Sequence, residues 1–298
     1  RYRHVTGVQT CALPISGTTP ASIDWPVAFL GAIKAGVVPV AVNTLLKPQD
    51  YEYMLRDSRA RVLFVSQALL PSFEGLATTV PTLAHVVVSS APGAAGASRP
   101  GAFGDFDALL AGGSDHFEPA DTVADEPCFW LYSSGSTGAP KGTVHIHSSL
   151  VQTAELFARP VIGIRESDIV FSAAKLFFAY GLGNGLTFPM SVGATTLLMA
   201  ERPTPDAVFL RLTGEAPEAL AKLRARPTVH YGVPTLFASM LASPSFPARE
   251  QLGLRVATSA GEALPARVGT TFTERTGVEI LDGIGSTEML HVFLSNRS

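Results

Sequence analysis

One glycine-rich segment constrains the fold more than any other part of the chain. It is YSSGSTGAPKG, residues 132–142, with three glycines, a run of hydroxyl side chains and one lysine. Glycines let a backbone bend and approach a ligand, amide and hydroxyl hydrogens donate to phosphate oxygens, and lysine neutralises charge. The preceding apolar run, residues 128–132, indicates a buried strand, and residues 143–158 begin extended and become helical near Ser148. This order is the context of a phosphate-binding site.

Two simpler interpretations of the segment are weaker. A short Gly/Ser/Thr cluster is typical of a solvated turn, but such a turn needs no buried strand before it. The common P-loop requires Gly, four residues and then Gly-Lys-Ser/Thr, whereas Lys141 here lies between Pro140 and Gly142. A different nucleotide-binding superfamily is therefore indicated.

The segment resembles the phosphate loop of the adenylate-forming enzymes, which include acyl- and aryl-CoA ligases, luciferases and peptide-synthetase adenylation domains. Two later motifs agree in order: SAGEALP (residues 259–265) resembles the turn that contacts adenine, and DGIGSTE (282–288) resembles the segment that runs past adenine to the α-phosphate and the metal. The strings KLFFAYGLGNGLTFPMSVGA (175–194) and GSTEMLHVFLSNR (285–297) look more specifically like the benzoate-CoA ligase branch.

The resemblance implies a reaction in two steps. A carboxylate attacks the α-phosphorus of ATP to give an acyl-adenylate and pyrophosphate, and the thiol of coenzyme A then displaces AMP. An anion must approach a polyanion, so the site needs a metal and hydrogen-bond donors rather than a nucleophilic side chain. ATP, Mg²⁺ and coenzyme A are thus the implied cofactors and co-substrates, and benzoate or a substituted benzoate is the implied acid.

The same resemblance assigns roles at the nucleotide. Thr287 is expected to donate to the α-phosphate, Glu288 to bind Mg²⁺ and Lys141 to neutralise phosphate charge, so these three are the candidate catalytic residues. A hard cation that keeps several waters needs one or two carboxylates, which suits a single glutamate. The residues expected to hold the β- and γ-phosphates are Ser133, Ser134, Gly135, Ser136, Thr137, Gly138 and Lys141. Those expected to line adenine are Gly261, Glu262, Asp282, Gly283 and Ile284.

For the acid, the resemblance indicates Ala179, Tyr180, Gly285, His291 and Val292. Small residues at Ala179 and Gly285 leave room for a flat ring, while Tyr180 and Val292 supply apolar walls, so the pocket suits benzoate-sized acids better than long chains. His291 has two open interpretations, as a group that approaches the carboxylate or ring and as a structural histidine.

Aromatic residues raise two further expectations. Ile284 stands where many relatives place a ring that stacks on adenine, which weakens the expectation of that stacking but not of the site. Phe177, Phe178 and Phe188 are expected in the core.

Composition excludes several classes of protein. The 298 residues are 46% hydrophobic and carry a net charge of −3, so there is no basic field for nucleic acid or an anionic membrane. Two cysteines exclude a disulfide scaffold and fit the cytoplasm. The strongest apolar run, residues 27–42, is interrupted by Lys34, Gly36 and Pro39, so no transmembrane helix is expected.

Alternating helices and strands predict the fold. Residues 22–36, with Ser22 as N-cap, and 47–60, with Pro48 near the first turn, have helical patterns, whereas 37–43, 61–66 and 85–90 are short apolar strands. A further helix is expected through residues 175–185. This alternation predicts an α/β fold with doubly wound, mostly parallel sheets and flanking helices. By the resemblance it is the large N-terminal lobe of the adenylate-forming fold, incomplete at both ends.

Residues 1–16 read as non-native sequence. The string VTGVQTCALPI resembles translated sequencing-adapter read-through, and residues 17–298 then form a partial AMP-binding N-terminal domain. The ribose-binding Asp and the small C-terminal lobe with its catalytic Lys would lie downstream. We therefore expect no full ligase activity from this polypeptide alone, and robust benzoyl-CoA formation by it would refute this.

Alternatives to an aryl-acid CoA ligase remain open. One is another acyl-CoA ligase or adenylation domain of the superfamily, and one from another class is an inactive, truncated nucleotide-binding module. The expected partners are small molecules, with no nucleic acid and no membrane. The sequence leaves the ring substituents and the oligomeric state open, a homodimer included.

Overall fold

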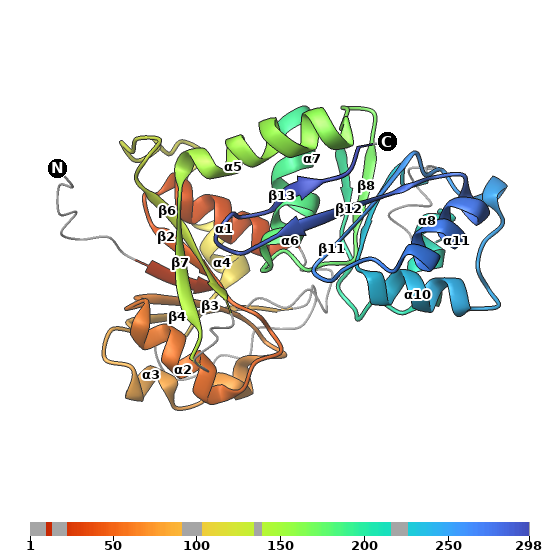
Figure 1. Ribbon diagram of the computed structural model, residues 1–298. Coiled ribbons are helices and arrows are strands. Elements are labelled where there is room, and N and C mark those ends of the chain that lie inside the picture. The colour runs from red at the N-terminus through yellow and green to blue at the C-terminus, as the bar shows by residue number, and fades with distance from the viewer. Residues whose placement is uncertain (1–9, 14–22, 91–102, 134–138, 216–225, 298) are drawn as a thin grey trace. The chain divides into compact units, whose positions relative to one another are not determined.

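The chain is seen in a computed structural model that describes residues 10–13, 23–90, 103–133, 139–215 and 226–297 (Figure 1). It divides into two compact units, residues 1–148 and residues 149–298. Each unit is built on one mostly parallel sheet. The predicted α/β class with mostly parallel sheets is therefore confirmed.

The sheet of the first unit has the strand order β5-β4-β3-β1-β2-β6-β7. Neighbouring strands are parallel except β6 and β7, which form an antiparallel pair. The strands are β1 (Thr10–Leu13), β2 (Val38–Ala41), β3 (Val62–Ser66), β4 (His85–Ser89), β5 (Phe103–Asp105), β6 (Pro127–Ser133) and β7 (Lys141–Ile146).

Helices cover both faces of this sheet. Consecutive residues of a strand point to opposite faces, so the packing of two neighbouring residues shows what covers each face. On β6, Phe129 meets Phe29 of α1 with ring centroids 5.5 Å apart, whereas Trp130 packs with the cluster that contains Tyr51 of α2. The helices are α1 (Asp24–Lys34), α2 (Pro48–Asp57), α3 (Leu76–Thr79), α4 (Phe106–Ala111) and the 3₁₀ turn η2 (Leu70–Phe73). Helix α5 (His147–Thr153) continues the chain from β7.

Two details at the start of the chain bear on the sequence predictions. The expected N-cap Ser22 lies outside the described residues, and the described N-cap of α1 is Ile23, whose side chain makes no capping hydrogen bond. Strand β1 pairs in parallel with β2 and β3, although it lies in the segment assigned to non-native sequence. The origin of residues 1–16 stays a prediction.

The sheet of the second unit has the order β13-β12-β11-β10-β8-β9, and only β12 and β13 are antiparallel among its paired strands. The strands are β8 (Ile169–Ser172), β9 (Thr195–Leu197), β10 (Val229–Gly232), β11 (Val256–Ala260), β12 (Ile280–Gly285) and β13 (Val292–Ser295).

This second sheet is also covered on both faces. On β8, Phe171 joins a cluster with Phe209, Phe237 and Phe272, whereas Val170 joins a different cluster. The first cluster is supplied by α8 (Pro205–Leu212), α10 (Pro234–Ala242) and α11 (Ala266–Thr276), and the 3₁₀ turn η5 (Arg249–Gln251) lies between the last two along the chain. The second is supplied by the π-helix η3 (Ala154–Ile162) and α7 (Phe188–Val192).

The helix predicted through residues 175–185 begins later than expected. It starts at α6 (Ala179–Leu182) and passes through the π-helical turn η4 (Gly183–Thr187) into α7. Residues 175–178 form a turn, because the Lys175 ammonium is held by the carbonyl oxygens of Met199, Ala200 and Glu201 at 2.5, 3.1 and 2.6 Å. Burial lowers the pKa of Lys175 to about 8.

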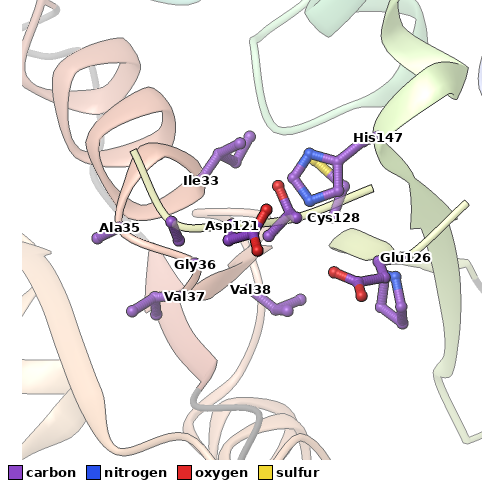
Figure 2. A pocket seen from close by; sticks show the side chains of 12 residues that line it. Ile33, Ala35, Gly36, Val37, Val38, Asp121, Glu126, Cys128 and His147 are labelled. Atoms are coloured by element: carbon purple, nitrogen blue, oxygen red, sulfur yellow. The ribbon is translucent and has the colours of Figure 1, made fainter. Parts of the chain in front are cut away.

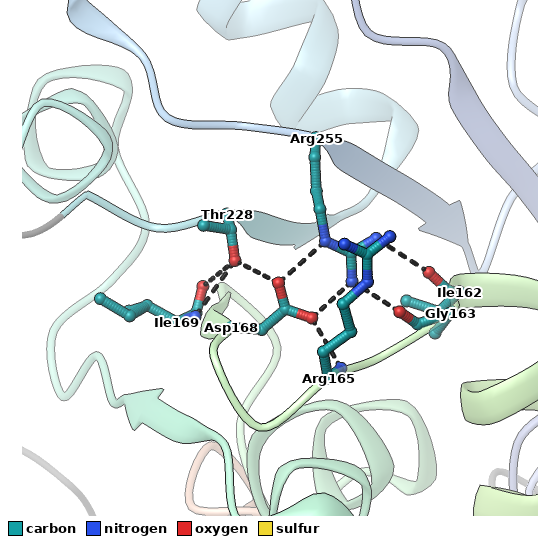
Figure 3. Close-up of polar contacts among 7 residues, drawn as sticks. All are labelled: Ile162, Gly163, Arg165, Asp168, Ile169, Thr228 and Arg255. Carbon is teal, nitrogen blue, oxygen red and sulfur yellow. Dashed lines mark hydrogen bonds and ion pairs between the residues drawn. The ribbon is translucent and has the colours of Figure 1, made fainter.

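A buried carboxylate joins the amino-terminal ends of three strands (Figure 3). Asp168, before β8, accepts hydrogen bonds from the guanidinium of Arg255, before β11, and from the Thr228 hydroxyl, before β10, at 2.7 Å. The Asp168 side chain is 3% exposed. Burial opposes its ionisation, but these hydrogen bonds and the Arg165 amide hold the pKa of Asp168 below its ordinary value. The cluster therefore stabilises the edge opposite the carboxyl ends of the strands.

We predict that Arg255→Met lowers the free energy of unfolding by about 3 kcal/mol, because it leaves a buried carboxylate without its ion-pair partner. The difference in the free energy of unfolding between wild type and variant should be complete above pH 3.8, the ordinary pKa of aspartate. It should disappear as the pH falls through the lowered pKa of Asp168. Urea denaturation measures both effects. In the exposed Arg56–Glu52 pair, Arg56→Met should cost less than about 1 kcal/mol. Equal losses in the two variants would contradict the prediction.

Candidate functional site

The predicted phosphate segment joins the two strands of a β-hairpin in the first unit. Ser133 is the last residue of β6 and lies opposite Lys141, the first residue of β7. Tyr132 lies opposite Gly142 one pair further from the loop. A Cβ at Gly142 would lie 3.0 Å from Cε3 of the Trp130 ring, so glycine suits this close contact. The loop residues Ser134, Gly135, Ser136, Thr137 and Gly138 lie outside the described residues.

The base of this hairpin is fixed to α2. The Tyr132 hydroxyl donates to the Asp57 carboxylate at 2.7 Å. Burial and the neighbouring carboxylate raise the pKa of Tyr132, so its hydroxyl keeps the proton that it donates. The Lys141 side chain is exposed at the start of β7, where its charge can meet an anion. The hairpin thus gives the two described ends of the phosphate segment a defined position.

The predicted adenine residues lie together in the second unit, at the carboxyl ends of parallel strands. In the register of β11 and β12, Ser259 pairs with Asp282 and Ala260 with Gly283. Gly261 follows β11 with φ of 98°, a left-handed conformation that favours glycine. Glu262 is exposed beside it. The carboxyl edge of a parallel sheet is where α/β proteins bind ligands.

Asp282 has one satisfied and one unsatisfied carboxylate oxygen. Its Oδ2 accepts from the Leu264 amide at 3.4 Å, whereas its buried Oδ1 has no partner within the described part of the chain. A buried acceptor without a donor is costly, so this oxygen suits a ligand that donates. Ile284, two residues on, is 60% exposed at the same strand.

Thr287 and Glu288 lie in the turn that follows β12. The Leu290 amide donates to the Thr287 carbonyl at 3.1 Å, and the Met289 amide donates to the Ser286 hydroxyl at 3.2 Å. The Glu288 side chain is exposed. Among the described residues, no group of three or more His, Cys, Asp or Glu side chains is arranged to hold a metal ion. The role of Glu288 as a metal ligand stays a prediction.

His291 lies at the centre of the predicted acid site and is buried by aromatic rings. Its ring centroid is 4.5 Å from that of Phe188 and 5.2 Å from those of Phe157 and Tyr180. Burial lowers the pKa of His291 to about 3, so the imidazole is neutral at physiological pH. A neutral ring cannot form an ion pair with a carboxylate, and its burial among aromatic rings fits the structural interpretation. Its approach to the carboxylate or ring of an acid stays a prediction.

Among the other predicted acid residues, the Tyr180 ring and the Gly285 backbone lie against this histidine, and Val292 follows it in the chain. The Tyr180 hydroxyl lies 2.6 Å from the Thr258 hydroxyl of β11. A Cβ at Gly285 would lie 2.8 Å from the His291 carbonyl oxygen, and one at Gly283 would lie 2.6 Å from Cγ1 of Val292. Ala179 begins α6, one residue before Tyr180. The structure thus brings these residues of the second unit together.

Sequence analysis missed or misplaced several residues near this site. Phe188 is buried as predicted, but Phe178 is 46% exposed, because it lies in the turn before α6, and Phe177 is partly buried. Asn184 and Gly183 were not singled out, yet both contact His291: Asn184 Oδ1 lies 3.0 Å from its Nε2, and a Cβ at Gly183 would overlap its ring. The signal available was their place inside the string 175–194.

A separate cavity of about 300 Å³ lies in the first unit (Figure 2). It is lined by the turn between α1 and β2, by Asp121 and Glu126 of the segment that leads into β6, by Cys128 of β6 and by His147 at the start of α5. Burial raises the pKa of the Cys128 thiol to about 12, so it is a poor nucleophile. None of the candidate site residues that the structure describes lines this cavity.

Comparison with known proteins identifies relatives over most of the chain. Residues 14–298 match the family of AMP-binding enzymes. The benzoate–CoA ligase of Thauera aromatica is 63% identical over 276 residues, which cover 93% of this chain and 49% of that protein.

Solved structures give the same result. A benzoate CoA ligase from Burkholderia xenovorans LB400 superimposes with a TM-score of 0.83 at 51% identity, over 99% of this chain and 54% of that one. An anthranilate CoA ligase, AuaEII, in complex with anthranoyl-AMP superimposes with a TM-score of 0.84 at 38% identity, over 98% of this chain and 53% of that one. The chain therefore spans about half the length of the relatives it matches.

No helix in the described ranges combines the length and the apolar composition that a membrane span requires.

We predict that stability falls with acidification because two histidines are buried in the neutral state. Burial lowers the pKa of His230 to about 4 and that of His291 to about 3, from an ordinary value of 6.5. Below pH 6.5 the unfolded chain binds protons that the folded chain does not, so the free energy of unfolding should drop by about 3 kcal/mol between pH 7.5 and 5.5.

Urea denaturation at these two pH values measures the drop. His230→Phe should remove about half of it, whereas the matched change His116→Gln, at an exposed histidine, should leave it unaltered. An unfolding free energy that is the same at both pH values would contradict the prediction.

Proposed function

Because this chain belongs to the family of AMP-binding enzymes, we propose that it forms the nucleotide- and acid-binding part of an ATP-dependent aryl-acid CoA ligase. Its substrates are benzoate or a substituted benzoate, ATP and coenzyme A, and its products are the aroyl-CoA, AMP and pyrophosphate. The names of its relatives, a benzoate–CoA ligase and a structure bound to anthranoyl-AMP, support this choice. We place the reaction in the cytoplasm, in keeping with two cysteines and an ordinary charge balance.

One observation carries the proposal: the adenine strand and the acid wall are in van der Waals contact. Gly283 of β12, in the adenine set, packs against Val292 of β13, in the acid set. Two residues on, Gly285 meets the backbone of His291. An acyl-adenylate places an acid and an adenosine on either side of one phosphate, so its two binding sites must be neighbours.

The adenine end of this surface offers a specific acceptor. The unpartnered Oδ1 of Asp282 suits the exocyclic amine of adenine, which is a donor. The exposed Ile284 supplies an apolar surface for the base, less strongly than an aromatic ring would. Gly261 and Glu262 follow the neighbouring strand.

The phosphate groups require donors and positive charge. Lys141 and Ser133, at the described ends of the hairpin, hold the β- and γ-phosphates together with the loop between them, and Thr287 donates to the α-phosphate. Glu288 would hold Mg²⁺, which supplies positive charge to the phosphates when it is bound. These side chains bind and orient the reactants, so the acid carboxylate itself is the nucleophile.

The acid pocket favours a flat aromatic acid. Phe157, Phe188 and Tyr180 enclose His291, and the neutral imidazole adds a wall without a charge. Such walls select by shape and apolar contact, which suits a benzene ring better than a flexible chain.

We predict that Lys141→Met raises the dissociation constant for ATP with Mg²⁺ about tenfold, because a charge-assisted contact to phosphate is lost. The dissociation constant for benzoate should stay within twofold. Isothermal titration calorimetry on the 298-residue chain measures both constants. Lys34→Met removes another exposed lysine of the first unit and should change neither. Failure of the wild-type chain to bind ATP, or parallel losses for ATP and benzoate, would overturn the proposal.

A further inference from the structure

Asn184 is a fully buried amide for which no role has yet been given. Its side chain is 0% exposed in η4, the π-helical turn of the second unit. A buried side-chain amide normally makes hydrogen bonds that offset the cost of its burial. The π-helical turn that carries it is a type of turn frequent at functional sites. The Oδ1 of Asn184 lies 3.0 Å from Nε2 of His291. The question is what this contact does for the histidine.

The two acceptors around Nε2 decide which nitrogen carries the proton. Besides Asn184 Oδ1, the carbonyl oxygen of Tyr180 lies 3.2 Å from the same nitrogen. A carbonyl oxygen cannot donate, so Nε2 carries the hydrogen and Nδ1 keeps a lone pair. Nδ1 is buried and has no partner among the residues that the structure describes.

Packing alone cannot set the orientation of this ring. Phe157, Tyr180 and Phe188 surround it, and a Cβ at Gly183 would lie 2.5 Å from its Cδ2. An imidazole turned over by half a rotation about its Cβ–Cγ bond has almost the same shape. Such a turn would put Cε1, a carbon, where Nε2 now meets the two oxygens. The hydrogen bonds therefore select one of two forms that apolar contacts would accept.

We propose that Asn184 is a positioning residue of the acid pocket, whose amide oxygen holds His291 in one ring orientation with the proton on Nε2. Its part in acid binding rests on the proposed function. Because of this contact, the His291 ring presents the same atoms to the pocket in every molecule. Its Nδ1 is then the ring atom that can accept a hydrogen bond. Without the amide oxygen, the Tyr180 carbonyl alone opposes the turned ring.

The test is nitrogen NMR of the 298-residue chain labelled with ¹⁵N-histidine, with His291→Gln to assign the signals. The wild-type chain at pH 7 should show His291 as a single Nε2–H tautomer. Asn184→Leu, close in shape but without an acceptor, should show a mixture of forms and raise the dissociation constant for benzoate about fivefold. The constant for ATP should stay within twofold in the same variant.

Two further variants separate positioning from a general loss of packing. Asn184→Asp keeps an acceptor oxygen and should restore the single Nε2–H form. Asn43→Leu, the same change in the first unit, should leave both the tautomer and benzoate binding unaltered. An Nδ1–H tautomer or an imidazolium in the wild-type chain would overturn the proposal even if Asn184→Leu does not fold. An Asn184→Leu variant that keeps a single tautomer and the wild-type benzoate constant would also overturn it.

The proposed function can fail separately. If the wild-type chain binds no benzoate while the tautomers behave as expected, the substrate is wrong and the positioning of His291 by Asn184 stands.

Discussion

The close approach of β13 to β12 is the constraint on which the second unit's site depends. Two glycines of β12, Gly283 and Gly285, leave out the side chains that would otherwise hold the strands apart. Each would place a Cβ within 3 Å of Val292 or of the His291 backbone. A Cβ at Gly285 would meet the backbone of His291, which no rotamer change can move, so glycine is required there wherever β13 follows this path. A Cβ at Gly283 would meet the branched Val292 side chain, so glycine at this position leaves room for that side chain. In the function that we propose, this close approach lets the adenine residues and the acid residues share one surface.

The two units offer different electrostatic environments, which suit the two kinds of ligand that we propose for them. At the proposed acid site of the second unit, burial keeps His291 neutral and Tyr180 protonated, so these two side chains carry no charge. At the phosphate hairpin, Lys141 is exposed and Tyr132 is fixed to Asp57. A neutral pocket holds an aromatic ring by apolar contact, whereas charge and hydrogen-bond donors are kept for the phosphates.

Much of the fold followed from sequence, because local signals determine it, whereas the candidate residues came from motif strings and their roles stay predictions. Pro48 begins α2 as its position before an amphipathic run predicts, and the apolar runs became β2, β3 and β4. The motif strings indicated Tyr180, Asp282 and His291, which the structure places in one unit at the carboxyl edge of its sheet or beside it. The predicted start of the helix through residues 175–185 was wrong. Lys175 binds the carbonyl oxygens of residues 199–201, and a contact between segments so distant in sequence leaves no local signal. The hydrogen bond from His291 to Asn184 spans 107 residues and leaves no local pattern.

The most direct test of the account is the affinity of a stable aroyl-adenylate mimic, benzoyl-sulfamoyl adenosine, measured by calorimetry beside AMP and benzoate. If the adenine strand and the acid wall form one surface, the mimic gains from both sites at once and should bind at least about a hundredfold more tightly than AMP. Gly285→Ala, which pushes the His291 backbone away, should reduce that advantage. A mimic that binds no more tightly than AMP would contradict the account, because the two sites would then not lie within reach of one ligand.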